Sequence, residues 1–342
     1  MTKIEKLDGL LLFSDNQIKD AMHVLNKGVY NFQIVVDKNY VLLGTITDGD
    51  IRRAFLKGLT IESYVTDCMN KNPAFSYINN ESTYNKLLED TKSIIKFIPV
   101  VDKDKVVKFI IVDQQSSVNK IALVMAGGFG KRLGDITKNT PKPLLKLGKE
   151  PLLETLLKKL EDSNFTTIYV STYYLYDQIE DFLKKRESKV DIKILIEDKP
   201  LGTAGCISLI PKNNYETLLV INADVITEVN LQSLCLFHQE SNNDITITVA
   251  KHKDKFKFGV VEFDSNFNFL SLKEKPIFER FILSGIYCLN KNICQLINEE
   301  NIDMTDLINR AFLLKKIIGI YPIIEFWKDI GSPEDLSSVN LK

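Results

Sequence analysis

Residues 121–145, which read IALVMAGGFGKRLGDITKNTPKPLL, decide the fold of the larger part of this chain. An apolar run leads into a loop of small residues that ends at Gly130, and the cations Lys131 and Arg132 follow at once. Lys142 stands between two prolines further on. Small residues let backbone N–H groups approach a polyphosphate closely, and neighbouring cations offset its charge. The stretch therefore predicts a phosphate-binding loop at the end of a buried strand.

Two common phosphate-binding patterns do not fit this loop. A P-loop requires glycine where Met125 stands and serine or threonine where Arg132 stands. The dinucleotide fingerprint requires glycine where Leu133 stands. The stretch instead resembles the GGxGxRL…PKPL signature of nucleoside-diphosphate-sugar pyrophosphorylases, the sugar-1-phosphate nucleotidyltransferases. The resemblance continues to residue 336 with its motifs in the family's order, although Asp135 replaces a proline that is usual in the family.

Composition excludes several classes of function. The chain has 342 residues and a formal net charge of −1, which predicts about two domains and gives no electrostatic support for nucleic-acid binding. Its apolar runs are strand-sized, so we expect no membrane span, and the absence of an apolar secretory core predicts a cytoplasmic protein. Five scattered cysteines and three histidines show no metal-ligand spacing, so we expect neither disulfides nor a zinc site.

The first third of the chain contains an internal repeat. Residues 32–37 (FQIVVD) align with 97–102 (FIPVVD), and residues 41–48 align with 106–113 at the same offset. Two copies of one unit that reads helix, strand, turn, strand therefore lie in tandem.

This repeat resembles a tandem pair of CBS motifs, which often bind adenine nucleotides in the cleft between the copies. We expect this small α+β module to span residues 1–117 and the nucleotidyltransferase domain to span 118–342. The polar residues 113–120 are interpreted as the linker. Because CBS pairs commonly associate side to side, the resemblance implies a homo-oligomer, with a dimer expected.

The two copies differ at the positions that contact nucleotides in the family. Thr47 and Asp50 have the family's T-x-x-D spacing, and the carboxylate can accept from a ribose diol while the hydroxyl donates at a helix N-terminus. The second copy has Val112 and Gln115 at the matching positions. Only the first copy is therefore expected to bind AMP or ATP in this way. An alternative role for Thr47 and Asp50 is to cap the helix that follows.

From residue 121 onward the pattern alternates between strands and helices. Strands are expected at 121–125, 167–172, 192–197 and 218–223, with helices between them. The alternation predicts an α/β fold, with a Rossmann-like, mixed but mostly parallel sheet covered on both faces. The resemblance implies a GT-A-like nucleotidyltransferase domain. In such sheets ligands lie beyond the carboxyl ends of the strands, where the glycine loop falls.

A second motif, EDKPLGTAG at 197–205, follows the third of these strands. The resemblance implies that it lies against the nucleobase. The Glu197 carboxylate only accepts hydrogen bonds, which suits the N1–H and 2-amino donors of guanine better than uracil or thymine. Glu197 could instead cap the helix or pair with a lysine. GTP is therefore the expected nucleotide, with implied contacts at Ala126, Gly127, Gly128, Gly130, Lys131, Arg132, Glu197, Pro200, Gly202 and Thr203.

Two aspartates match the family's metal ligands. Asp224 follows a buried strand, and Asp329 lies far downstream in the sequence WKDIGSPED. Either one alone would be interpreted as a turn residue. Mg²⁺ prefers one or two carboxylates together with phosphate oxygens and water, so a pair is sufficient. The resemblance implies that they hold catalytic Mg²⁺, within a catalytic set of Arg132, Lys142, Asp224 and Asp329.

The sugar side is carried by a Glu-Lys-Pro motif at 274–276. The resemblance implies that Glu274 accepts from sugar hydroxyls and that Lys275 meets the sugar phosphate. Gly259 and Gly285 belong to small-residue segments that are similar to those lining the sugar pocket in the family.

The implied reaction joins GTP and a sugar-1-phosphate to give a GDP-sugar and pyrophosphate. A CBS pair ahead of a compact guanylyltransferase domain resembles enzymes that make GDP-glucosamine for legionaminic acid synthesis. Mannose-1-phosphate is the main alternative substrate, and heptose-1-phosphate is another. A hypothesis of a different class is an adenine-nucleotide sensor with a non-catalytic transferase domain. The complete set of Arg132, Lys142, Asp224 and Asp329 argues against that hypothesis.

Overall fold

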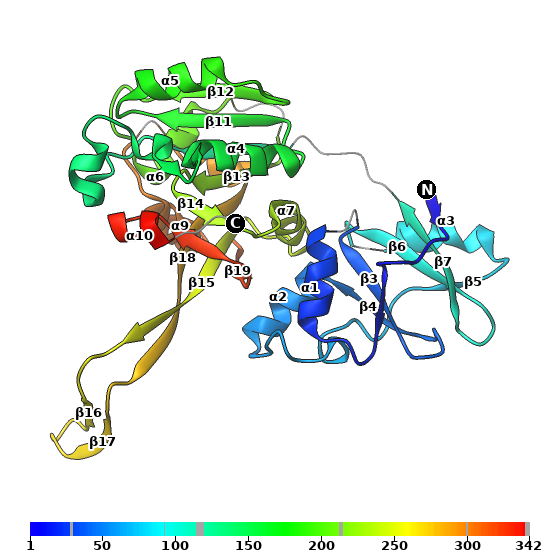
Figure 1. Cartoon of the computed structure of the whole chain (residues 1–342). Coiled ribbons are helices and arrows are strands. Elements are labelled where there is room, and N and C mark those ends of the chain that lie inside the picture. Colours follow the sequence, from blue (N-terminus) through cyan, green and yellow to red (C-terminus); the bar gives the residue numbers. More distant parts are fainter. Residues whose placement is uncertain (28–29, 92, 114–119, 212–214, 299, 339–342) are drawn as a thin grey trace.

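The computed structural model describes residues 1–27, 30–91, 93–113, 120–211, 215–298 and 300–338. Figure 1 shows a small N-terminal module beside a larger α/β domain, from which a long two-stranded arm extends. No helix among the described residues is both long and apolar enough to cross a membrane.

The N-terminal module contains two small sheets. One sheet contains β2 (Leu11–Phe13), β3 (Phe32–Val36) and β4 (Leu42–Thr47). The other contains β1 (Thr2–Ile4), β7 (Val107–Asp113), β6 (Lys96–Val101) and β5 (Ser76–Tyr77). The helical segments are α1 (Ile18–Lys27), α2 (Asp48–Leu56), η1 (Val65–Asp67) and α3 (Glu81–Asp90).

The structure confirms the internal repeat. The equivalent rings of Phe32 and Phe97 stack with centroids 3.8 Å apart and planes 5° apart. Val41 and Val106, also equivalent, form an antiparallel bridge between the two hairpin turns. The two copies therefore pack against each other through matching positions. Of the predicted linker 113–120, residues 114–119 lie outside the described residues.

The α/β domain is built on a seven-stranded sheet with the order β12-β11-β8-β13-β18-β15-β19. Its strands are β8 (Ile121–Met125), β11 (Thr167–Thr172), β12 (Asp191–Ile196), β13 (Thr217–Asn222), β15 (Ile245–Lys255), β18 (Ile277–Asn290) and β19 (Ile318–Ile323). The first four are parallel, β18 is antiparallel to both β13 and β15, and β19 is parallel to β15. The predicted mixed, mostly parallel sheet is confirmed.

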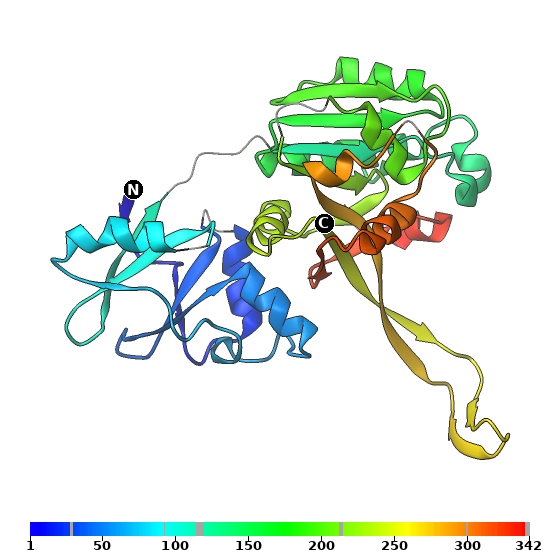
Figure 2. The same ribbon diagram turned by 180° about the vertical axis from the view of Figure 1, so that it is seen from behind.

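Strand β8 contributes to a core on each face of the sheet. Ala122 and Val124 pack with one set of helices, whereas Ile121 and Leu123 pack with the other. Alternate residues of a strand point to opposite faces, so an unbroken apolar run is required here. Figure 2 shows the helices on both sides. The first set is α4 (Leu152–Asp162), α5 (Tyr176–Lys185) and α7 (Leu231–Glu240), and the second is α6 (Gly202–Gly205), η4 (Cys206–Leu209), α8 (Lys291–Cys294) and α9 (Met304–Leu313).

A buried arginine joins the module to the α/β domain. Arg52 of α2 is fully buried and donates to Asp48, to the Pro322 carbonyl at 3.0 Å and to the Glu325 carboxylate at 2.5 and 2.9 Å. Its guanidinium lies 4.4 Å from the ring centroid of Tyr321, whose hydroxyl donates to Asp48 at 2.8 Å. Burial alone would lower the pKa of Arg52, but Asp48, Tyr321 and Glu325 raise it well above its ordinary value. Arg52 is therefore a charged link between the two parts.

We expect Arg52→Met to lower the free energy of unfolding by about 3–5 kcal/mol, because Asp48 and Glu325 would remain buried without their cation. Urea denaturation measures the change. The control is Arg53→Met on the same helix, since Arg53 is half exposed and its ion pair within the described part of the chain is with Asp50 at 2.7 Å. A surface pair of this kind contributes about 1 kcal/mol or less. Equal small losses in both variants would contradict a stabilising role for the Arg52 network.

Candidate functional site

Two short strands bring the predicted metal ligands together. β14 (Val225–Thr227) pairs antiparallel with β20 (Trp327–Asp329), with Val225 opposite Asp329. The Ile330 amide donates to the Asp224 carbonyl at 3.0 Å. Asp224 lies just after β13 at the carboxyl edge of the sheet, so Asp329 reaches the same edge from the far end of the chain.

Two predicted catalytic cations lie against this carboxylate pair. Lys142 begins the short helix η3 (Lys142–Leu144), and its Nζ forms an ion pair with Asp224 and lies 3.9 Å from Oδ1 of Asp329. Arg132, at the start of η2 (Lys131–Thr137), places Nη2 3.7 Å from Oδ2 of Asp329. The structure therefore brings all four residues of the predicted catalytic set into one cluster.

The glycine loop forms the wall beside this cluster. Gly130 has φ +64°, and a Cβ there would lie 2.9 Å from the Thr137 side chain, whose hydroxyl donates to the Gly130 carbonyl. Around Gly128 no heavy atom lies within 4 Å of such a Cβ, so this backbone is open to a ligand. Asp135 pairs with Lys138 at 2.7 Å. The loop and the cluster enclose a cavity of about 440 Å³ lined by Met125, Ala126, Gly128, Phe129, Gly130, Lys131, Arg132, Leu133, Lys142, Pro143, Ala223, Asp224 and Gly331.

The carboxylate pair is electrostatically strained. Burial and then the charge of Asp224 raise the pKa of Asp329 to about 6, against opposing effects from Lys142 and Arg132. One oxygen of each carboxylate, Oδ1 of Asp224 and Oδ1 of Asp329, is buried without a hydrogen-bond partner among the described residues. Two such oxygens beside a phosphate-type loop fit Mg²⁺, which takes few carboxylates and completes its shell with phosphate and water. Within the described ranges there is no cluster of three or more metal-ligating side chains.

Glu197 is buried against the glycine loop. A Cβ on Gly127 would lie 2.9 Å from its Oε1, so glycine is needed for this approach. Oε1 accepts from the Ser171 hydroxyl at 2.6 Å, and Oε2 accepts from the Leu201 amide at 2.9 Å. The second contact matches the capping alternative for Glu197. Each carboxylate oxygen can accept a further hydrogen bond, so the side chain also retains capacity for a base.

The rest of the second motif packs against the start of α9. Gly202 has φ +76°, and a Cβ there would lie 2.6 Å from the Ile302 carbonyl. The Thr203 hydroxyl accepts from the Met304 amide at 2.8 Å. Pro200, Gly202 and Thr203 do not line the cavity. These residues hold the segment in place behind Glu197, a role that the motif alone did not predict.

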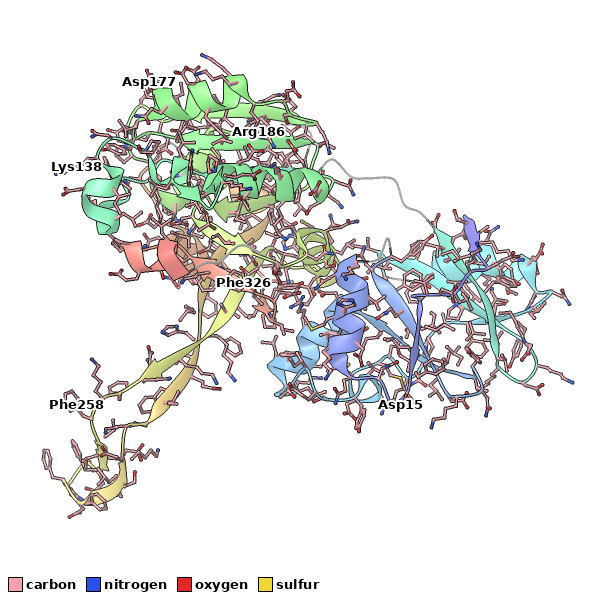
Figure 3. The ribbon with its side chains drawn as sticks, viewed as in Figure 1. Asp15, Lys138, Asp177, Arg186, Phe258 and Phe326 are labelled. Carbon is pink, nitrogen blue, oxygen red and sulfur yellow. The ribbon has the colours of Figure 1, made fainter. Side chains whose placement is uncertain are left out.

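The structure separates the predicted sugar-side residues. Gly285 lies beside the carboxyl end of β13, where a Cβ would lie 2.7 Å from Nδ2 of Asn222. Gly259, Glu274 and Lys275 instead lie on the arm. Figure 3 shows Phe258, the neighbour of Gly259, near the end of the arm, well away from the α/β domain.

Thr47 and Asp50 line a second cavity, of about 400 Å³, in the N-terminal module. They also form a capping box on α2, in which the Asp50 carboxylate accepts from the Thr47 amide at 2.9 Å, so the capping role is confirmed. Glu240 of α7 lines the same cavity and accepts a hydrogen bond from Ser93. A ligand here would touch both parts of the chain. In the second copy Val112 lies in β7, and Gln115 is outside the described residues.

Comparisons with known proteins agree with this geometry. The nucleotidyl transferase family model matches residues 121–342, and the CBS domain model matches residues 11–57. The mannose-1-phosphate guanylyltransferase catalytic subunit beta of Drosophila melanogaster is 31% identical over 221 residues, which cover 63% of this chain and 60% of the relative. The putative mannose-1-phosphate guanyltransferase of Sulfolobus acidocaldarius is 28% identical, covering 65% of this chain and 62% of the relative. The chain thus spans about three fifths of the length of these curated relatives.

Solved structures confirm the fold. HddC from Yersinia pseudotuberculosis superposes with a TM-score of 0.50 at 27% identity, covering 64% of this chain and 96% of that one. A further structure of HddC is a complex with GMP-PN. A putative glucose-1-phosphate thymidylyltransferase from Bacillus anthracis has a TM-score of 0.51 at 21% identity, which supports the fold alone.

We expect Asp329→Asn to raise the melting temperature of the metal-free protein at pH 7.5. Since its folded pKa is about 6, against 3.8 ordinarily, the folded state binds a proton at Asp329 more tightly than the unfolded chain does. The stability from this group is therefore full below about pH 4 and is lost as pH rises through about 6. The variant's advantage should accordingly disappear on acidification to pH 4, as measured by differential scanning fluorimetry in EDTA.

Asp102→Asn is the control, and its expected change in melting temperature has the opposite sign, because the hydrogen bond from Lys108 lowers the pKa of Asp102. That variant should be slightly less stable than wild type at pH 7.5. An Asp329→Asn protein that melts below wild type at pH 7.5 would contradict the strained carboxylate pair.

Proposed function

The chain belongs to the nucleotidyl transferase family, and we propose that it is a sugar-1-phosphate guanylyltransferase, which converts GTP and a sugar-1-phosphate into a GDP-sugar and pyrophosphate. The observation that supports this most is the convergence of Arg132, Lys142, Asp224 and Asp329 beside the glycine loop. A non-catalytic sensor would not need two carboxylates held together at the cost that the raised pKa of Asp329 indicates. We assign the activity to residues 118–342.

In the proposed reaction an oxygen of the sugar phosphate attacks the α-phosphorus of GTP. The new P–O bond forms as the bond to the β-phosphate bridging oxygen breaks, and the electron pair leaves with pyrophosphate. The attacking oxygen is already anionic, so no general base is required. The main barrier is repulsion between two polyanions, which Lys131, Arg132 and Lys142 would reduce by holding the triphosphate.

We propose that Asp224 and Asp329 hold the Mg²⁺ of this reaction. Their unpartnered buried oxygens support this assignment. When bound, the ion would neutralise phosphate charge where the two substrates meet. Lys142, which contacts both carboxylates, would keep their side chains in position.

GTP is the proposed nucleotide, and Glu197 the residue that selects it. The relatives named as guanylyltransferases and the GMP-PN complex of HddC support this choice. The buried position of Glu197 against Gly127 places an acceptor-only group beside the loop that would hold the phosphates. For the sugar, the names of the relatives favour mannose-1-phosphate, whereas the tandem arrangement with a CBS module favours glucosamine-1-phosphate, with heptose-1-phosphate a third candidate.

Pyrophosphate release with Mg²⁺ tests this proposal. GTP, UTP, dTTP, CTP and ATP are each combined with mannose-, glucosamine-, glucose- and heptose-1-phosphate. We expect turnover with GTP and one of these sugars, and none from Asp224→Asn under the same conditions.

In the same assay Glu197→Gln should lose about tenfold or more in kcat/KM for GTP, because the amide N–H of glutamine would face an N–H donor of guanine. The control is Asp198→Asn, an exposed neighbour that should retain wild-type selectivity.

Two outcomes would contradict parts of the proposal. Turnover with UTP or dTTP alone would remove the guanine assignment and keep the reaction class. The absence of turnover with every pair would favour the sensor hypothesis.

We also propose that the cavity at Thr47 and Asp50 binds AMP or ATP. Isothermal titration calorimetry with each nucleotide should give a saturable signal that weakens about tenfold in Asp50→Ala, because the ribose would lose a charged acceptor. Glu62→Ala is the control, since Glu62 is exposed in the same module and does not line the cavity. Equal affinity in wild type and Asp50→Ala would leave Asp50 with its capping role alone.

A further inference from the structure

A two-stranded arm carries three of the predicted sugar-side residues away from the α/β domain (Figures 1 and 2). Strands β15 and β18 leave the sheet together, and their pairing continues from Lys251 opposite Phe281 to Lys255 opposite Ile277. The end of the arm is the hairpin β16 (Val260–Phe263) and β17 (Phe269–Lys273). Residues 245–250 of β15 are buried in the domain, whereas nearly all of the residues beyond are exposed.

The base of the arm is fixed by a buried bulge. The register of β15 and β18 shifts between Ile247 and Val249, and bulges of this kind redirect strands. The Thr248 hydroxyl forms a hydrogen bond with the Ser284 hydroxyl and donates to the Ile286 carbonyl at 2.6 Å. The Trp327 indole donates to the Ser284 carbonyl at 2.8 Å. The base of the arm is therefore held by two contacts within the β15–β18 pair and by one hydrogen bond to β20, the strand that carries Asp329.

One face of the terminal hairpin is apolar and uncovered. On the opposite face Glu262 accepts from Ser271 and pairs with Lys273. The apolar side chains are between 51% and 83% exposed, and they are Val261, Phe263, Phe267, Phe269 and Leu272. An isolated two-stranded hairpin is at best marginally stable in water. These five side chains offer on the order of 700 Å², close to the roughly 800 Å² that each partner buries in a standard interface.

The same hairpin presents the sugar-side motif. Gly259 packs against Glu274: a Cβ on Gly259 would lie 3.0 Å from Oε2 of Glu274. Lys275 has φ +46°, a conformation that non-glycine residues rarely adopt and that often marks functional turns. Within the described chain, every side-chain bond, ion pair and ring contact of residues 256–277 is made inside the arm. No arm residue lines the cavity at Asp224.

We propose that the arm completes the active site of a second copy of this chain, supplying Glu274 and Lys275 in trans. This inference rests on the proposed function, because it assigns the sugar phosphate to these residues. A second copy is the occupant that the observations favour, since each site lacks the sugar-side residues that its own arm holds elsewhere. Reciprocal exchange about a two-fold axis covers both apolar faces and closes at a dimer.

Sedimentation velocity tests the dimer without reference to activity. Wild type should sediment as a dimer, and Phe263→Ser/Phe269→Ser should sediment as a folded monomer. Both side chains are exposed within one copy of the chain, so the monomeric variant should still unfold cooperatively in thermal denaturation. A wild-type monomer at assay concentrations, or a double variant that sediments as wild type does, would overturn the proposal.

Complementation between two inactive variants tests the exchange of residues. Asp224→Asn removes a metal ligand and keeps the arm, whereas Lys275→Ala keeps the metal ligands and should lower kcat/KM about a hundredfold. After subunit exchange, a 1:1 mixture should recover about a quarter of the wild-type rate, because half of the dimers are mixed and each has one intact site. The control is Lys257→Ala, on the same arm, which should be as active as wild type without being mixed with another variant.

A mixture that stays inactive while wild type turns over would show that the arm acts in cis and would overturn the proposal. Wild-type turnover in Lys275→Ala alone would overturn it as well. Failure of the proposed function is a different result, in which wild type itself is inactive with every substrate pair. Sedimentation then still decides whether the arm joins two copies.

Discussion

The pairing of β14 with β20 is the constraint on which the proposed active site at the carboxyl edge of the sheet depends. Each strand has three residues, yet this pairing joins a carboxylate after the central strand β13 to one more than a hundred residues later. The chain between them must therefore leave this edge of the sheet and return to it, and on the way it forms β18, β15 and β19, which extend the same sheet on the side of β13 opposite β8. The arm is part of this same excursion. Its base is bonded to β20 through Trp327, so the proposed metal ligand Asp329 and the arm are held by the same short strand.

Holding two carboxylates together has an energetic cost, and the surrounding charges limit it. The raised pKa of Asp329 reflects burial and the nearby Asp224, and Lys142 and Arg132 act against both. The segment that leads into β20 is held from the other side as well. Glu325, four residues before Asp329, is bound by the buried Arg52 of the N-terminal module. The module is thus attached to the segment that positions Asp329, one of the two proposed metal ligands.

Much of the α/β domain could be predicted because its signals are local. The run 121–125 is apolar at every position, and the structure has β8 over the same residues. The motif resemblance also identified the four charged residues that converge. Other features have no local signal. Arg52 lies in a charged helix beside Arg53, and only the fold shows which of the two is buried. Likewise, the packing of Gly202 and Thr203 on α9 depends on a segment about a hundred residues away.

The sugar-side motif shows a different limit of sequence reasoning. A motif fixes the order of residues along a chain, and a resemblance assumes that they meet within that chain. Here Gly285 stays beside Asn222 at the carboxyl end of β13, while Glu274, eleven residues earlier, lies on the arm. The register of β15 and β18 shifts between Ile247 and Val249, where the arm leaves the sheet. The sequence shows the phenylalanines of the arm. An alternating strand with one apolar face predicts that this face is buried, but the pattern does not indicate which surface covers it. Only the direction of the arm in the structure shows that the apolar face is not covered by the α/β domain of the same copy.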